Sequence, residues 1–424
     1  MKIQTVRGTR DFYPEDMAFR NWLFERWRRA SRRAGFVEVD GPELEPLELY
    51  TEKSGEEIAD QLYWLTDKGG RKLALRPEFT PTLARMVAAR QAALPEPIRW
   101  FNISRCFRYE RAQKGRLREF FQWNVDLIGI DDVLADAECI SLAVDAMKEV
   151  GLGPTDVQVR INDRRLLGAL VQHLGIAEAS VAKVFAILDK RAKVPPEALA
   201  VMLAEAGLEA AQRDRLERIL AWGSLADIAA EELAMPEVRA AADGLRRLFD
   251  TLAAYGLAEW CRFDIGIVRG LAYYTGPVWE MHDVKGEFRA IFGGGRYDRL
   301  LGEMGGKPMP ACGFGCGDVV LGLLLQERGL RPEMERPAEY FVASAAEAVG
   351  PNVLTVVQHL RGHGQTVQFD LKGGSMKRQM KKAADAGARF VVIVGDAFAA
   401  TRHVTLRDMT SGEQREVALD GVGA

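Results

Sequence analysis

Cysteine and histidine are both scarce in this chain of 424 residues, with five of each. The cysteines include no pair spaced CxxC, and Cys312 and Cys316 lie in a glycine-rich stretch without histidine partners. Such a scattered, odd set argues against a disulfide scaffold or a zinc site, and it favours reduced thiols in the cytoplasm. The histidines lie outside the motif-rich stretches described below. We therefore expect neither a histidine-based catalytic triad nor a histidine-rich metal centre.

Long apolar runs and a strong net charge are also absent. No run reaches membrane-spanning length, and the N-terminal MKIQTVRGTRDF has no apolar signal region, so no membrane association is expected. The 57 basic and 60 acidic residues give a net charge of −3, which excludes a generally basic, nucleic-acid-coating surface. Any contact with a polyanion must therefore be local. A chain of this length is too long to fold around one hydrophobic core, so two or three domains are predicted.

Hydrophobic periodicity predicts how the first domain, residues 1–328, is organised. Helical spacing of apolar residues predicts a helix over 16–34, and strict alternation predicts a strand over 157–163. Residues from about 165 to 260 are rich in Ala, Leu, Glu and Arg with helical spacing. Because strand-like sequence resumes near Phe263, we interpret this region as a helical insertion within the first domain.

A second domain is predicted beyond a linker. The stretch GLRPEMERP at 329–337 has linker composition, and residues 338–424 alternate short strands with helices. This alternation predicts a small, separate α/β domain with a largely parallel sheet.

The stretch RCFRYERAQKGRLREFFQWNVDLIG at 105–129 combines a charge run with aromatic residues. Its flanks are β-rich, which predicts a strand, a charged loop and a second strand. Arg108 ends the first strand, and Phe120 and Gln122 lie on the second. An arginine fork suits phosphate oxygens and a ring suits a base, so this hairpin can hold a nucleotide. An exposed basic hairpin is an equally good interpretation from spacing alone.

A carboxylate is predicted at a strand-to-helix junction in LALRPEFTPTLAR, residues 73–85. Glu78 lies there beside Thr80, a candidate helix N-cap, and its carboxylate can accept hydrogen bonds from an ammonium group. Taken alone, a capping interaction is the favoured interpretation.

An isolated charge, Arg269, lies in the apolar, aromatic run IVRGLAYYTGPVWE. Burying it unpaired would be costly, so it needs an anionic partner from the protein or a ligand. If this run is a strand, Tyr273 and Tyr274 face opposite sides and at most one lines a given site. Gly293–Gly295 matches neither a dinucleotide loop nor a Walker loop, and we expect a plain turn rather than close approach to a ligand.

Together, in their order, these stretches resemble the histidyl-tRNA synthetase family of class II aminoacyl-tRNA synthetases. Residues 35–56 resemble motif 1, 107–120 resemble motif 2 and 310–325 resemble motif 3. RGLAYYTGPVWE and GGGRYD resemble the histidine-specific signatures, and 371–396 is similar to the anticodon-binding domain. The resemblance implies an antiparallel-sheet core with a helical insertion, a C-terminal α/β anticodon-binding domain, and a homodimer formed through motif 1. It also implies ATP-dependent formation of histidyl-adenylate and transfer of histidine to tRNA(His).

The resemblance further implies roles for individual residues. ATP would be bound by Arg108 at the α-phosphate, Glu110 at the adenine, Arg116 at the β- and γ-phosphates and Phe120 stacked on the base. Arg269 and Gln122 would bind the histidine carboxylate and the α-phosphate, and with Arg108 they would be catalytic. Glu78 and Thr80 would hold the α-ammonium group. The other histidine-binding residues would be Asp126, Tyr274 and Tyr297 around the imidazole, with Tyr273 beside them. Mg²⁺ is expected on the pyrophosphate side of ATP, and no metal site is expected in the protein itself.

Three positions depart from the family pattern. Asp126 stands where common bacterial members have Glu, Ala272 where they have Asp, and Val320 where motif 3 normally ends in Arg. One interpretation is a non-catalytic paralogue that binds histidine, like the regulatory subunit of ATP phosphoribosyltransferase. The favoured one is a branch of true synthetases similar to plant organellar forms, because motif 2, Arg269 and the C-terminal domain are all present.

Basic residues recur at helical spacing in the C-terminal domain, at Lys377, Arg378, Lys381 and Lys382. They can track the phosphates of tRNA, although a solvated helix face has the same pattern.

Overall fold

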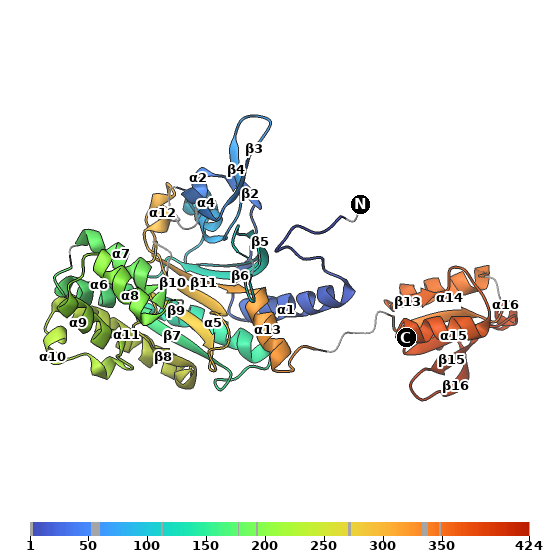
Figure 1. The fold of residues 1–424 in the computed structure, drawn as a ribbon. Coiled ribbons are helices and arrows are strands. Elements are labelled where there is room, and N and C mark those ends of the chain that lie inside the picture. Colours follow the sequence, from blue (N-terminus) through green and yellow to red (C-terminus); the bar gives the residue numbers. More distant parts are fainter. Residues whose placement is uncertain are drawn as a thin grey trace. The chain divides into compact units, whose positions relative to one another are not determined.

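The computed structural model describes residues 3–51, 60–111, 113–176, 178–191, 194–269, 273–332, 338–346 and 349–423. The chain divides into two compact units, Met1–Pro332 and Glu333–Ala424 (Figure 1). The boundary falls within the stretch 329–337 that was predicted to be a linker, of which 333–337 lie outside the described residues.

An eight-stranded sheet forms the centre of the first unit. Its strand order is β1-β5-β6-β11-β10-β9-β7-β8, and only the edge pairs β1·β5 and β7·β8 are parallel. In that order the strands are Val37–Glu38, Ile98–Phe107, Glu119–Ile128, Ala311–Gly317, Phe292–Arg296, Pro277–Asp283, Val157–Asp163 and Cys261–Phe263. The mainly antiparallel core agrees with the predicted fold class.

One face of this sheet packs against long helices. Helix α1 (Pro14–Arg33) begins with proline at its first position and acidic residues in its first turn, as helix starts favour. Its Trp27 stacks on Trp123 of β6, with ring centroids 5.8 Å apart. Helix α5 (Val133–Glu149) lies beside α1, and α13 (Asp318–Glu327) contacts β6. The helices leave the opposite face of the central strands for the site.

A helical region lies between β7 and β8. Its described residues form no strand, and its helices run through Arg164–His173, Glu178–Leu188, Pro196–Glu205, Ala210–Leu220, Ala230–Leu233 and Pro236–Ala254, labelled α6 to α11. Helix α11 packs on both α5 and α6, which joins this region to the central sheet.

A small three-stranded sheet carries the segment before motif 2. Its order is β2-β4-β3, formed by Leu44–Pro46, Lys72–Leu75 and Tyr63–Thr66. Among the described residues, the unit also contains the helices α2 (Glu48–Thr51), α4 (Thr80–Arg90) and α12 (Leu300–Glu303).

The second unit is an α/β domain with a five-stranded sheet in the order β13-β12-β14-β15-β16. In that order the strands are Val367–Phe369, Tyr340–Ser344, Phe390–Val394, His403–Asp408 and Gln414–Ala418. Its helices are α14 (Pro351–Gly362), α15 (Met376–Asp385) and α16 (Phe398–Thr401). Only the pairs β12·β13 and β12·β14 are parallel, so the sheet is mixed and not largely parallel as predicted. The last three strands follow one another through short connections, which permit antiparallel pairing.

Candidate functional site

We call the face of the central sheet that the long helices do not cover the open face. In the middle of this face, strands β10 and β11 carry glycines in place of side chains. Residues directly opposite one another in neighbouring strands point to the same face. One row across the sheet is Asp126, Gly313, Gly295 and Val278. The next row is Asn124, Gly315, Gly293 and Glu280. We call Gly293, Gly295, Gly313 and Gly315 the glycine floor.

The glycine floor makes room for functional side chains. A Cβ on Gly295 would lie 2.8 Å from the Tyr274 ring, and one on Gly315 would lie 2.6 Å from Nε2 of Gln122. A Cβ on Gly293 would collide with the Arg269 guanidinium. The expectation of a plain turn at Gly293–Gly295 was therefore wrong. These glycines form strand β10, and they serve the close approach of the protein's own side chains.

Arg269 has the anionic partner that its burial requires. Its Nη1 donates a 2.6 Å hydrogen bond to Oε1 of Glu280, whose Oε2 lies 2.9 Å from Nε2 of His282. Burial raises the pKa of Glu280, but Arg269 and His282 outweigh burial and bring this pKa to about 2. Arg269 has φ of +59°, a left-handed conformation that costs a non-glycine residue roughly 1–2 kcal/mol. The backbone is thus strained where the guanidinium enters the site.

Glu280 and His282 were missed in the sequence, although their spacing on a strand places them on one face. The histidines were expected to lie apart from the motifs, yet His282 contacts the partner of Arg269. The signal was the period-two spacing of two polar residues within the apolar strand β9.

Three tyrosines gather beside the glycine floor. The ring centroids of Tyr273 and Tyr274 are 5.1 Å apart, and those of Tyr273 and Tyr297 are 5.9 Å apart. All three rings are buried in one cluster. The argument that Tyr273 and Tyr274 face opposite sides required a strand, and residues 273–276 are not a strand. Both rings lie in the same buried cluster.

Each of two buried carboxylates is bonded to a tyrosine. The Tyr273 hydroxyl donates a 3.1 Å hydrogen bond to Oε2 of Glu78, and the Tyr297 hydroxyl donates to Oδ1 of Asp126. The other oxygens, Oε1 of Glu78 and Oδ2 of Asp126, have no hydrogen-bond partner among the described residues. Such buried acceptors are costly unless a ligand donor meets them.

Burial and neighbouring charges set the pKa values of these carboxyl groups. Burial raises the pKa of Asp126 to about 7, although the Tyr297 hydrogen bond acts to lower it and Glu78 raises it further. Burial also raises the pKa of Glu78, and the positive charges of Arg108 and Arg269 act to lower it. Both guanidinium groups are therefore close enough to Glu78 to affect its ionisation.

The predicted hairpin is present as β5, a connecting loop described over 108–111 and 113–118, and β6. Arg108 donates a 3.0 Å hydrogen bond to the carbonyl oxygen of Pro77, and its guanidinium lies over the Phe120 ring, 5.2 Å from the centroid. Glu110 is buried and forms an ion pair with Arg116 in the loop. The four residues expected at ATP thus belong to one hairpin, with Arg108 turned toward the Glu78 segment.

The junction of β4 and α4 holds Glu78 and Thr80. Glu78 lies between Leu75, the last residue of β4, and the start of α4. Thr80 is the first helical residue rather than the N-cap, a position taken by Phe79, so the capping interpretation was wrong. A capping role therefore explains neither residue.

The family model described as histidyl-tRNA synthetase matches residues 8–317, and the anticodon binding domain model matches 339–424. The chain belongs to the histidyl-tRNA synthetase family.

Relatives in this family are similar over nearly the whole of this chain. The chain is 43% identical to the chloroplastic/mitochondrial histidine–tRNA ligase of Arabidopsis thaliana, over 98% of the chain and 85% of that protein. It is 42% identical to the histidine–tRNA ligase of Opitutus terrae, over 100% of the chain and 97% of the relative. The crystal structure of histidyl-tRNA synthetase from Nostoc sp. PCC 7120 superposes with a TM-score of 0.82 at 26% identity, covering 99% of this chain and 98% of that one.

The stretch that resembles motif 3 ends in helix α13, which contains Val320. Val320 is buried, and a Cβ on Gly115 of the motif 2 loop would lie 3.4 Å from its Cγ2. Asp318, the first residue of α13, accepts hydrogen bonds of 2.8 Å from Arg10 and from the Phe121 backbone. Ala272, the second departure, lies outside the described residues.

No helix in the part of the chain that the structure describes is long and apolar enough to cross a membrane. Among the same residues, no group of three or more His, Cys, Asp or Glu could hold a metal ion. All five cysteines are buried and free, with the Sγ atoms of Cys139 and Cys312 3.8 Å apart.

Proposed function

We propose that the open face of the central sheet is where this synthetase-family chain joins histidine to ATP. The overall reaction is ATP-dependent activation of L-histidine to histidyl-adenylate, followed by transfer of histidine to tRNA(His). The observation that carries the assignment of the site is that Arg108 bonds to Pro77, next to buried Glu78, while Tyr273 of the tyrosine cluster bonds to Glu78 itself and the Arg269 guanidinium lies over Gly293 of the same open face.

Histidine is recognised at both of its ends. The free Oε1 of Glu78 accepts from the α-ammonium group, with Thr80 beside it, and the free Oδ2 of Asp126 accepts from the imidazole. Because the Tyr297 hydroxyl is already bonded to Asp126, it orients that carboxylate rather than the ring directly. Tyr273 and Tyr274 enclose the substrate. Apolar rings of similar size are rejected since they leave buried acceptors unpaired.

ATP lies along the motif 2 hairpin. Arg108 binds the α-phosphate, Arg116 the β- and γ-phosphates, Glu110 the adenine and Phe120 stacks on the base. The Arg116–Glu110 pair must open or share its charge when the nucleotide binds. Mg²⁺ accompanies ATP on the pyrophosphate side. Magnesium is commonly held mainly by substrate phosphates and water.

Positive charge and alignment account for the chemistry. The histidine carboxylate oxygen attacks the α-phosphorus, a new P–O bond forms, and the bond to the leaving pyrophosphate breaks. The carboxylate is already ionised, so no general base is required. Arg108, Arg269 and Gln122 hold the two anions together and stabilise the charge that grows on the phosphoryl oxygens.

We assign the chain to a branch of active synthetases without the motif 3 arginine. The 43% identity to a plant organellar ligase and the match to the anticodon-binding model support this assignment over a regulatory paralogue. A Cβ on Gly115 would lie 3.4 Å from Cγ2 of Val320, so the motif 2 loop passes close to this position.

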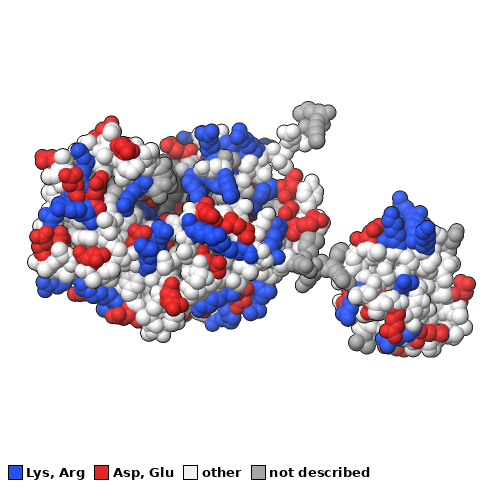
Figure 2. All heavy atoms as spheres, turned by 60° about the horizontal axis from the view of Figure 1, so that its bottom comes forward, with Lys and Arg blue, Asp and Glu red and all other residues white. Residues whose placement is uncertain are grey.

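Transfer RNA is proposed to contact helix α15 of the C-terminal unit. Figure 2 shows Lys and Arg side chains gathering on one edge of this unit. Lys377 and Lys381 are exposed, whereas Lys382 is tied to Asp370 and Arg378 lies 3.6 Å from the same carboxylate. Lys377 and Lys381 are therefore the better candidates for phosphate contacts.

A homodimer through motif 1 and a cytoplasmic location complete the proposal. Val37 and Leu44 are exposed apolar side chains on the short strands β1 and β2 of motif 1, which suits an interface. Trp64 and Leu65 are exposed on β3, in the same small sheet as β2. Light scattering decides the oligomeric state, and fractionation of the source cells decides the location.

Histidine-dependent exchange of pyrophosphate into ATP tests the proposed reaction, with Arg269→Ala as the control that should abolish it. Exchange in the wild type and charging of tRNA(His) are the expected results. Histidine binding without ATP binding or turnover would instead support the regulatory paralogue.

A further inference from the structure

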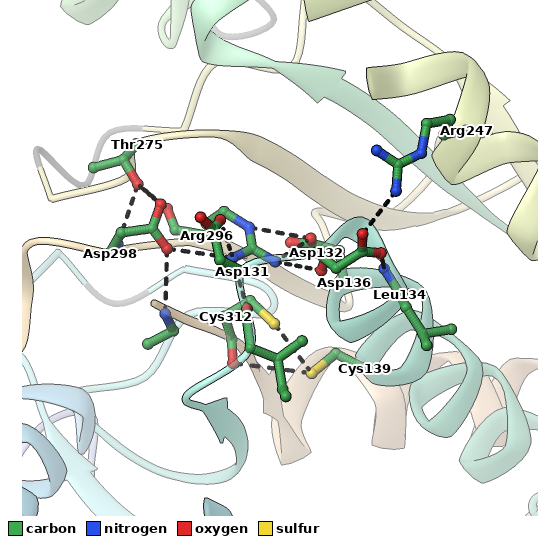
Figure 3. A network of polar contacts seen from close by, with 12 residues as sticks. Asp131, Asp132, Leu134, Asp136, Cys139, Arg247, Thr275, Arg296, Asp298 and Cys312 are labelled. Carbon is green, nitrogen blue, oxygen red and sulfur yellow. Dashed lines mark hydrogen bonds and ion pairs between the residues drawn. The ribbon is translucent and has the colours of Figure 1, made fainter. Parts of the chain in front are cut away.

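Arg296, the last residue of β10, is only 4% exposed, and every N–H group of its side chain donates a hydrogen bond (Figure 3). Nε and Nη2 donate to Oδ2 of Asp136 at 3.1 and 2.6 Å. Nη2 also donates to the Asp132 carbonyl at 2.8 Å. Nη1 donates to the Ile130 carbonyl at 3.1 Å and to Oδ1 of Asp298 at 3.3 Å. An arginine side chain has five N–H groups, and here each has an acceptor.

The residues directly before and after Tyr297 in the sequence both belong to this network. Arg296 precedes the tyrosine and Asp298 follows it, and the two are joined through their side chains. The tyrosine that holds Asp126 is therefore fixed at each neighbouring residue.

The same network reaches the second tyrosine segment through Thr275. The Thr275 N–H donates a 2.7 Å bond to the Arg296 carbonyl. Its hydroxyl donates to Oδ2 of Asp298 at 3.1 Å and accepts from the Asp298 N–H at 3.1 Å. Thr275 directly follows Tyr274, so these bonds set where Tyr273 and Tyr274 lie relative to Tyr297. We call Thr275, Arg296 and Asp298 the clamp.

Helix α5 anchors the clamp. Asp136 is fully buried, and its Oδ2 accepts both bonds from Arg296. Asp132 caps the same helix, with its Oδ1 accepting from the Leu134 N–H, and its Oδ2 accepts from Arg247 of α11 at 2.7 Å. Through these bonds, the segments that carry the three tyrosines are held by a helix rather than by a loop.

We propose that Arg296, Asp298 and Thr275 are positioning residues that hold Tyr297 and the Tyr273–Tyr274 segment at the spacing histidine requires. This inference rests on the proposed function of the site. The clamp residues have no assigned contact with histidine or ATP, and they act through the three tyrosines. Displacing a substrate-binding group by about 1 Å can cost 10²-fold in rate, so such support has a large effect.

A purely stabilising role fits this network less well. Burying an arginine–aspartate pair costs desolvation that its attraction only partly repays, so the net gain in stability is small. Five directed hydrogen bonds from one planar fork instead define a single geometry. The clamp therefore predicts a change in histidine binding larger than any change in folding.

Thr275→Val is the first test, since it keeps the side-chain shape and the backbone bond but removes both hydroxyl bonds to Asp298. In the exchange assay we expect the KM for histidine to rise about tenfold, while the KM for ATP changes by less than about twofold. Thr275→Ser should restore the wild-type value. Thr251→Val is the matched control, because among the described residues that hydroxyl donates to the Arg247 carbonyl of its own helix and to no other group.

Arg296→Lys tests the centre of the clamp, because it keeps the charge and loses the fork. The same selective rise in the histidine KM is expected, and Arg165→Lys, whose partner Asp163 lies outside the clamp, is the control. Unchanged KM values, equal rises for both substrates, or a lower melting temperature with unchanged KM values would overturn the proposal.

Failure of the two proposals can be told apart. If the wild type shows no histidine-dependent exchange, the proposed reaction fails. Calorimetric titration of histidine into the wild type and Thr275→Val then decides the clamp independently: weaker binding in the variant supports it, and equal binding overturns it.

Discussion

Nη1 of Arg269 lies 2.6 Å from Oε1 of Glu280, across the position that a Cβ on Gly293 would occupy. The carboxylate neutralises the partly buried guanidinium and fixes the direction from which it enters the site. Since the backbone of Arg269 is left-handed, this side chain is held by the strand beneath it rather than by its own preference.

Replacing Arg269 by Ala should lower kcat/KM for pyrophosphate exchange by about 10²–10³-fold, because a charge aimed at the transition state is lost. Glu280→Gln should cost about tenfold, since the arginine remains but is oriented by a neutral partner. Exchange kinetics measure both, and circular dichroism confirms folding. A larger loss in Glu280→Gln than in Arg269→Ala would contradict this order.

The pKa of Asp126, raised to about 7, predicts that histidine binding weakens from about pH 8 to about pH 6. An ionised carboxylate accepts from the imidazole, and its protonation removes that acceptor. Free imidazole titrates in the same range, so Asp126→Asn supplies the profile of the ligand alone. Tyr297→Phe removes a hydrogen bond that lowers this pKa, so its midpoint should move to higher pH. Calorimetric titration of histidine across this pH range measures the midpoint. An unchanged midpoint in Tyr297→Phe would contradict the assignment of Asp126 as the imidazole acceptor.

The raised pKa of the Asp126 carboxyl group also predicts that the stability of the folded protein depends on pH. The pKa of Asp126 is raised in the folded protein from its ordinary 3.8 to about 7, so the folded state binds more protons than the unfolded state between these values. The free energy of unfolding contributed by Asp126 therefore falls as pH rises through this window, by up to about 4 kcal/mol, and is constant above it. Asp126→Asn should remove this component. Urea unfolding of both proteins at several pH values measures the difference in slope.

Gly293→Ala should displace the Arg269 guanidinium, whose Nη2 would lie 2.8 Å from the new Cβ. We expect a fall of about 10²-fold in kcat/KM for exchange. Gly317→Ala on the adjacent strand is the matched control, because nothing lies within 4 Å of its added Cβ. Equal activity of the two variants would exclude this steric role of the glycine floor.

Lys377→Ala and Lys381→Ala should each weaken tRNA binding and reduce the slope of log K against log salt by about 1, if each meets one phosphate. The effect should be similar for cognate and non-cognate tRNA. Filter binding over a salt series measures the slope. Arg415→Ala, also exposed and in the same domain, is the control that should leave it unchanged.

Periodicity and local chemistry were sufficient for much of the fold. The strand Val157–Asp163 has the predicted bounds, and α1 and the motif 2 hairpin lie where apolar spacing placed them. These elements are decided locally, by alternation, proline at a helix start and a polar loop between β-rich runs. The mixed pairing of the C-terminal sheet could not be predicted from local sequence patterns, because the direction of a strand depends on which strands become its neighbours in the fold.

The sequence by itself determined the family, the order of the motifs and the residue types that bind an anionic nucleotide and an amino acid. The tertiary structure decided that Gly293 and Gly295 are floor rather than turn, that Tyr273 and Tyr274 face one side, and that Glu280 and Arg296 support the site. These relationships join residues on different strands and helices, and their register is set by packing across the whole sheet. No spacing along the chain encodes which glycine will lie beneath which arginine.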